Sequence, residues 1–375
     1  MNGLKMLVLI LASTAAGRAE TPLSAWVKPG RTEVVTGKKR AFLKEPATMT
    51  VVMPAAVTTL EELKRINPQL PAVLPGLPAL LASAKVSPKF NELYDRKVRI
   101  LKRGTLMSDE DFFDCATVLN LTAGSGRHAL LLQSDMDVVT DGSDPDRLAR
   151  IEQYDVGSLD DDFQPMVGYY WEGKPNTRNP FLDYYPREIA AIDGFAAHFK
   201  ALINGNPQEK LPGDKCVAWR KLLAVCKSQS ESLTELYRKY AKDMLGGHSL
   251  VPELDPFVVL PGGWIAKSDK AAGDDPNQVY FGDYVAVIYK GSVYPAIVGD
   301  AGPDFKTGEA SLKMARAIRP TASGNLSAVD GAGVTYLVFP GTHEPRGEPN
   351  LEHIREQVSK LLDESGGAGV ELHKW

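Results

Sequence analysis

The chain contains the stretch Tyr284-Val-Ala-Val-Ile-Tyr-Lys-Gly-Ser-Val-Tyr-Pro-Ala-Ile-Val298, in which two apolar runs flank a Lys-Gly pair. Both runs are rich in β-branched and aromatic residues, which pack well in sheets, and Lys290-Gly291 is typical of a short turn. The stretch therefore predicts two adjacent strands, the second of which ends at Val298.

The residues that follow carry several carboxyl groups: Val298-Gly-Asp-Ala-Gly-Pro-Asp-Phe-Lys-Thr-Gly-Glu-Ala-Ser-Leu312. Asp300 comes just after the predicted strand, and Gly302-Pro303 is a turn signal because Pro presets φ and Gly tolerates positive φ. A chain that turns back here would bring Asp300 and Glu309 to one cleft. Such a pair is suited to acid and base chemistry.

A helix is predicted after this turn, because Leu312, Ala315 and Ile318 recur at helical spacing. Thr307 is the expected N-cap, which places Glu309 in the first helical turn. An acid in a first turn is also explained by its favourable interaction with the helix dipole alone. The spacing by itself therefore leaves a structural and a catalytic interpretation of Glu309 open.

Several segments resemble the family 75 glycoside hydrolases, the chitosanases known mainly from fungi. They are Gly299-Asp300, Gly308-Glu309-Ala310-Ser311, Met314-Ala315-Arg316, the run from Val334 to Gly341, and the Asp-rich segment from Ser134 to Gly142. Two positions depart from the fungal pattern. Thr140 stands where a cysteine is expected and Val139 where another acid is expected.

The resemblance implies endo-hydrolysis of the β-1,4 linkages of chitosan, a glucosamine polymer, with inversion at the anomeric carbon. It assigns Glu309 as general acid and Asp300 as general base. The two roles would exchange if a helix N-terminus lowered the pKa of Glu309. Asp304 is a reserve for either role or a substrate contact, and Asp135 and Asp137 are expected to contact the amines of the sugar.

Aromatic side chains near these segments are candidates for stacking on sugar rings. Trp171 and Trp264 are singled out, although a place in the core explains either one equally simply. Two other functions fit the same residues. The chain is then a non-catalytic protein that binds an amino-sugar polymer, or a hydrolase of peptidoglycan or another envelope glycan.

Composition and charge exclude several other functions. The 375 residues carry a formal charge of −4, and ten acids against two arginines lie between residues 134 and 162. That excess repels nucleic acid phosphates and attracts cations, although a solvated acidic loop also explains it. His-Glu-x-x-His, Gly-x-Ser-x-Gly and Gly-Lys-Ser/Thr loop motifs are absent from the sequence. We expect no metal, cofactor or nucleic acid partner.

The first residues are typical of an export signal. Lys5 precedes the apolar run Met6-Leu-Val-Leu-Ile-Leu11, and Gly17-Arg-Ala19 forms a small-x-small cleavage site. No other run is long and apolar enough to predict a membrane span, so a secreted or periplasmic location is expected. The three cysteines, Cys115, Cys216 and Cys226, are interpreted as free thiols.

The order of patterns predicts an α+β fold. Its β-rich core is expected to be a six-stranded double-psi-like barrel with peripheral helices. We divide the chain into a signal peptide (1–19), an N-terminal region (20–105), a catalytic domain (106–345) with a helical insert (186–247), and a C-terminal helix and tail (346–375). The N-terminal region contains a Pro-rich stretch over 70–88, which predicts irregular structure or a tether, and a helix from Ser87-Pro88 to Leu101. A short helix after Ser108 and a buried strand over 129–133 complete the prediction.

Overall fold

The computed structural model describes residues 54–103, 107–140, 167–172, 247–267, 275–324 and 326–375, together with a few short pieces elsewhere. The export signal, nearly all of the helical insert, Cys216 and Cys226 lie outside the described residues. Among the described residues, no helix has the length and apolar character needed to cross a bilayer.

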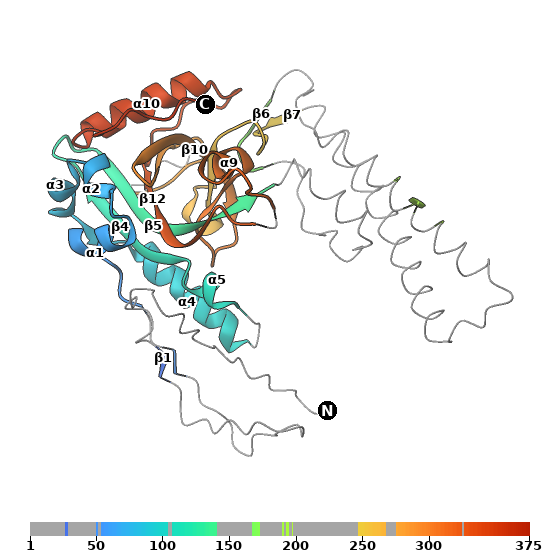
Figure 1. Cartoon of the computed structure of the whole chain (residues 1–375), viewed down its shortest axis with the longest axis horizontal. Helices are drawn as coiled ribbons and strands as arrows, with labels where there is room; N and C mark the ends of the chain where they lie inside the picture. Colours follow the sequence, from blue (N-terminus) through green and yellow to red (C-terminus); the bar gives the residue numbers. More distant parts are fainter. Residues whose placement is uncertain are drawn as a thin grey trace, which may run out of the picture.

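Six strands close into a barrel, which confirms the predicted β-rich α+β fold with a six-stranded barrel at its core (Figure 1). The strands are β5 (His128–Val139), β8 (Phe257–Pro261), β9 (Tyr284–Tyr289), β10 (Ser292–Gly302), β11 (Glu309–Ser311) and β12 (Val329–Val338). They follow the order β11-β8-β10-β9-β12-β5, and pairing of β11 with β5 closes the ring. The sheet is mixed, because β8 runs parallel to β10 and β11 parallel to β5.

Further strands lie outside the ring. The sheet continues from β5 through β4 (Cys115–Thr122) to β3 (Lys85–Val86), and two separate pairs join β1 (Val27–Lys28) to β2 (Thr50–Val51) and β6 (Tyr170–Glu172) to β7 (Gly247–Ser249). The free thiol of Cys115 is buried at the start of β4.

Helices pack around the barrel in two groups. One hydrophobic cluster joins Leu131, Ala286 and Leu337 of the barrel to α1 (Leu60–Ile66), α2 (Leu70–Val73), α3 (Leu77–Leu81) and α10 (Leu351–Glu364). The other joins the alternate residues of the same strands to α4 (Pro88–Lys102) and α9 (Leu312–Ile318). Side chains of a strand point to opposite faces in turn, so each strand contributes to both clusters. The short helix α5 (Asp109–Phe112) follows α4.

Several predicted elements are confirmed. The hairpin of β9 and β10 turns at Lys290-Gly291, where both residues have positive φ. The Ser87 side chain caps α4, and Pro88 occupies its first turn, where a backbone N–H would have no partner. The last helix is present as α10, and the short helix after Ser108 is α5.

Two predicted strand ends and one predicted irregular segment are wrong. The strand β10 continues past Val298 to Gly302, and β5 continues to Val139, so Asp300, Asp135 and Asp137 lie within strands rather than after them. Pairing with β8 and β11 extends these strands beyond their apolar runs. The Pro-rich stretch over 70–88 contains α2 and α3, each with a proline at N1 or N2, and is not irregular.

The predicted N-cap is also wrong. The helix α9 begins at Leu312, and the Oγ atom of Ser311 accepts a hydrogen bond from the N–H of Met314 at 3.3 Å. Thr307 instead donates its N–H to Asp114. Glu309 is therefore a strand residue of β11, and no helix dipole acts on it as proposed from the sequence.

Candidate active site

Strand register brings three acids into one row. Asp137 on β5 pairs with Glu309 on β11, Glu309 pairs with Val259 on β8, and Val259 pairs with Asp300 on β10. Side chains of directly paired residues point to the same face of a sheet. Glu309 and Asp300 are thus two strand spacings apart, roughly 10 Å at the backbone.

Asp300 lies just after a register shift between Val298 and Asp300. Its Oδ1 atom accepts hydrogen bonds from the N–H groups of Gly168 and Ala301, both at 2.8 Å. Burial raises the pKa of Asp300 to about 6, against the opposing effect of the two N–H groups, and the charge of Glu309 raises it further. This carboxyl group therefore changes its charge close to neutral pH.

Glu309 occupies the first position of β11, with a fifth of its side chain exposed. Burial is the main reason that its pKa is raised, and the ammonium group of Lys306, 3.5 Å from Oε1, acts against this. The backbone of Gly302 lies against the same carboxyl group. A Cβ atom there would be 2.7 Å from Glu309 Oε2, so only glycine fits without displacing the acid.

Asp137 lies next to Glu309 and is bound from two sides. Its Oδ2 atom is 2.7 Å from the Nζ atom of Lys306, and its Oδ1 atom accepts a hydrogen bond from the hydroxyl of Ser327 at 2.5 Å. About a quarter of the Asp137 side chain is exposed. This acid is therefore part of the same surface as Glu309.

Asp135 is buried behind this surface. Burial raises its pKa to about 9, and the charges of Asp114 and Asp137 add to the shift. A Cβ atom added at Gly308 would lie only 2.0 Å from Oδ1 of Asp135. The carboxyl group therefore packs against the backbone that leads into β11. The raised pKa favours the neutral form of this carboxyl group, which attracts an ammonium group less strongly than a carboxylate does.

Asp304 lies in the turn between β10 and β11. One of its carboxyl oxygens accepts a hydrogen bond from the N–H of Gly263 at 2.5 Å, and the other is 2.8 Å from Nη1 of Arg96 on α4. The side chain connects the turn to two neighbouring segments. Its surroundings differ from those of Asp300 and Glu309, neither of which forms an ion pair with an arginine in the described structure.

Trp171 lines a pocket of about 500 Å³. Gly168, whose N–H binds Asp300, is part of the same wall, which also includes Tyr170, Phe281 and Arg346. The Trp171 ring is partly exposed and stacks on His248 at 5.4 Å. Trp264, in contrast, is 3% exposed within the hydrophobic core, which leaves almost no ring surface for a sugar.

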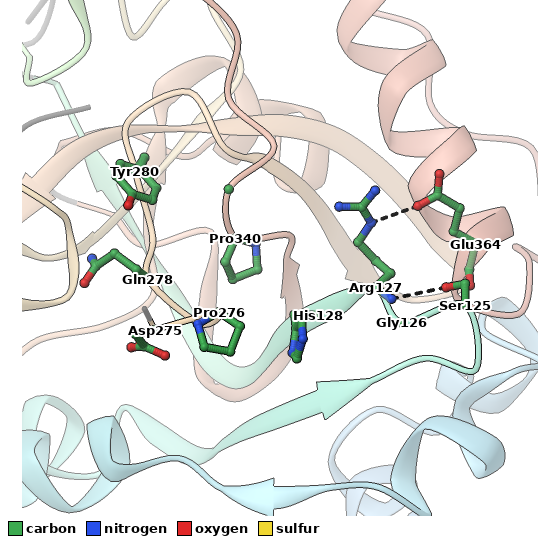
Figure 2. Close-up of a pocket in the computed structure, with 11 residues that line it drawn as sticks. Ser125, Gly126, Arg127, His128, Asp275, Pro276, Gln278, Tyr280, Pro340 and Glu364 are labelled. Atoms are coloured by element: carbon green, nitrogen blue, oxygen red, sulfur yellow. Dashed lines mark hydrogen bonds and ion pairs between the residues drawn. The ribbon is translucent and has the colours of Figure 1, made fainter. Parts of the chain in front are cut away.

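A second pocket of about 450 Å³ lies near the β4–β5 turn, where Arg127 pairs with Glu364 (Figure 2). Tyr280, Gln278 and Pro340 form its other side. None of the acids predicted from the sequence lines it. Asp300 and Glu309 are not among the residues that line the pocket beside Trp171 either, but Gly168 in its wall donates its N–H to Asp300.

Lys306, Gly168 and Gly302 contact the acids of the site but were not predicted from the sequence to belong to it. Of these three, Lys306 could have been predicted from the sequence, because it precedes Glu309 by three residues in the acidic segment. Gly168 lies far from Asp300 in the chain. No group of three or more histidine, cysteine or carboxylate side chains that would suit a metal ion occurs within the described ranges.

Glycosidases use a pair of carboxyl groups, and Asp300 and Glu309 are two carboxyl groups of raised pKa separated by one intervening strand. Comparison with known proteins gives a match over part of the chain. Residues 213–369 match the family model described as fungal chitosanase of glycosyl hydrolase group 75. The resemblance predicted from the sequence is confirmed over this range, where the chain is similar to the family 75 chitosanases.

The matched residues include β7 to β12 and α10, and with them Asp300 and Glu309. Asp135 and Asp137 on β5 lie outside the match. No curated protein matches the chain.

Proposed function

We propose that the protein is an exported, endo-acting glycoside hydrolase that cleaves the β-1,4 linkages of chitosan with inversion. One observation carries the proposal: Glu309 and Asp300 both pair with Val259, from opposite sides. Inverting enzymes place their carboxyl groups about 6.5 to 9.5 Å apart, so that a water molecule fits between base and sugar. Two strand spacings, roughly 10 Å at the backbone, suit that separation better than the ~5 Å of retaining enzymes.

In the proposed mechanism, Glu309 protonates the leaving oxygen and Asp300 activates the water. A general acid needs a raised pKa, and burial supplies it for Glu309. Because Glu309 is a strand residue, the helix dipole that favoured exchanging the two roles does not apply. Asp300 accepts two backbone hydrogen bonds, which support its ionised form as the base.

The remaining candidates have supporting roles in this proposal. Asp137 is partly exposed beside Glu309, which suits contact with a sugar amine. Tyr170 and Trp171 offer ring faces for stacking on sugars next to Asp300. Asp135, Asp304 and Trp264 stabilise the surroundings of the site through the buried or tethered positions described above. Export is proposed from the signal pattern of residues 1–19.

Substitution of the two acids tests the mechanism. We expect Asp300→Asn and Glu309→Gln each to lower kcat on partially acetylated chitosan by a factor of about 10² to 10⁴, measured as reducing ends formed over time. Asp330→Asn, which changes an exposed acid on β12, is the matched control. Activity close to that of the unmodified protein in either site variant would remove that residue from the mechanism.

The pH dependence of kcat/KM at low pH follows from the proposed base, Asp300. Since Asp300 must be ionised to activate water and its pKa is about 6, kcat/KM should fall as the pH falls below about 6.

NMR detection of the first anomer formed from glucosamine oligomers tests inversion. A protein that removes polymer from solution without forming reducing ends is a binding protein, and faster release of fragments from peptidoglycan than from chitosan indicates an envelope glycan as substrate.

A further inference from the structure

The loop between β10 and β11, residues 303–308, is fixed at several points. Asp304 binds the N–H of Gly263 and pairs with Arg96. The N–H of Lys306 donates to the carbonyl of Pro303 at 3.1 Å, which closes a turn. This end of the loop is therefore attached to α4 and to the segment after β8.

The other end of the loop is held by buried groups. The N–H of Thr307 donates to Asp114 at 3.1 Å, and the Thr307 hydroxyl lies 2.9 Å from that of Ser134. Asp114 forms an ion pair with Lys97 in which both side chains are fully buried. The carbonyl of Gly308 accepts a hydrogen bond from the N–H of Asp137 at 2.7 Å. Lys306 is thus presented from a loop whose backbone is fixed on both sides.

The ammonium group of Lys306 lies between two carboxyl groups of the site. It is 2.7 Å from Oδ2 of Asp137 and 3.5 Å from Oε1 of Glu309, with about a fifth of the lysine side chain exposed. Asp137 is held on its other side by Ser327. A partly buried cation shared by two acids is screened less by solvent than a surface ion pair.

We propose that Lys306 is a positioning residue of the reaction, which holds the carboxyl group of Glu309 beside Asp137 and controls the pH range in which Glu309 carries its proton. This inference rests on the proposed function, because it assumes that Glu309 is the proton donor. The groups that act on Glu309 are Lys306 from the loop, Asp137 from β5, Asp111 from α5 and Asp300 from β10.

When the charge of Lys306 is removed, the charged groups that still act on Glu309 are all acids. Lys306 lowers the pKa of Glu309, and Asp137 and Asp111 raise it. Without the ammonium group the pKa of Glu309 therefore rises further. The protonated form of the acid would then persist to higher pH, and the alkaline limb of the kcat/KM profile should move upward.

The first experiment compares Lys306→Met and Lys306→Gln with Lys306→Arg. The two uncharged variants should lose about tenfold or more in kcat, with the limb governed by Glu309 shifted up by about one pH unit or more. Lys306→Arg keeps the charge and should keep the limb in place. Lys360→Met, which removes an exposed charge from α10, is the control for net charge. Circular dichroism checks that each variant is folded.

A second readout does not depend on hydrolysis. The side-chain carboxyl carbon of Glu309, assigned by comparison with Glu309→Gln, is titrated by ¹³C NMR in the unmodified protein and in Lys306→Gln. An upward shift of its titration supports the inference even if chitosan proves not to be the substrate. An unchanged titration, or an unchanged pH profile with normal kcat, overturns it. Failure of the unmodified protein to release reducing ends contradicts the proposed function instead.

Discussion

At the scale of single residues, Asp135 is a carboxyl group that the folded chain keeps protonated. Burial raises its pKa to about 9, whereas an unfolded chain has an aspartate pKa of about 3.9. The folded state therefore holds a proton that the unfolded state releases. Folding stability should decrease as the pH rises from about 4 to about 9 through this group.

Asp135→Asn removes this loss of stability at high pH, because an amide is neutral without binding a proton. The amide oxygen can still accept the hydrogen bond from the Ser134 hydroxyl. We expect the variant to be more stable than the unmodified protein at pH 8, by on the order of 2 kcal/mol, and to show a flatter dependence on pH. Urea unfolding at pH 5 and pH 8 measures this. The exposed Asp330→Asn should leave the dependence unchanged, and a loss of stability of Asp135→Asn at pH 8 would contradict the prediction.

The sequence predicted which acids carry the proposed chemistry but not how they meet. Asp300 and Glu309 stand out by motif and by resemblance. Their common neighbour Val259 and the pairing of Glu309 with Asp137 are contacts between segments far apart in the chain, which no local pattern encodes. The buried surroundings of Asp135, and hence its raised pKa, depend on the same distant contacts.

At the scale of elements, Ser311 joins a strand to a helix. Its hydroxyl oxygen accepts the N–H of Met314 at the start of α9 and also the buried N–H of Phe257 at the start of β8. Ser311→Ala therefore removes a cap and leaves a buried donor without this acceptor. We expect a loss of about 2 kcal/mol in the free energy of unfolding.

The matched control is Asn350→Ala at the exposed N-cap of α10, where the side chain accepts a hydrogen bond from the N–H of His353 and the expected loss is about 1 kcal/mol. Both losses are measured by urea unfolding. Equal losses in the two variants would show that the bond from Phe257 contributes nothing.

Strands and helices with strong local patterns were predicted correctly, and boundaries next to the site were not. The apolar runs of β9 and β10 and the cap of α4 are local signals. Beyond Val298 the sequence Gly-Asp-Ala-Gly has little preference for a strand, yet it pairs with β8. Glu309 likewise lies in a strand because β5 and β8 flank it, although Thr307 suggested a helix start.

At the scale of the whole molecule, the barrel and the outer helices share one core. Residues of α1, α2, α3 and α10 belong to the same hydrophobic cluster as β9, β10 and β12. Asn67, just after α1, donates to the carbonyl of Ile288 at 3.2 Å, and the carbonyl of Leu63 accepts from Gln133 at 3.0 Å. The α+β class and a six-stranded barrel were predicted from the sequence. The pair of strands that closes the ring, β11 and β5, was not, because these segments are too distant in the chain for a local pattern to reveal.

This shared core predicts that α10 unfolds together with the barrel. Leu361 is 4% exposed in the cluster, so Leu361→Ala should lower the free energy of unfolding by about 3 kcal/mol. Leu254, 41% exposed, is the control, and its alanine variant should change stability by less than about 0.5 kcal/mol. Helical circular dichroism and tryptophan fluorescence, to which the buried Trp264 and four other tryptophans contribute, should give one coincident transition that moves to lower urea in Leu361→Ala. Two separate transitions, with only the helical signal shifted, would show that α10 is a unit independent of the barrel.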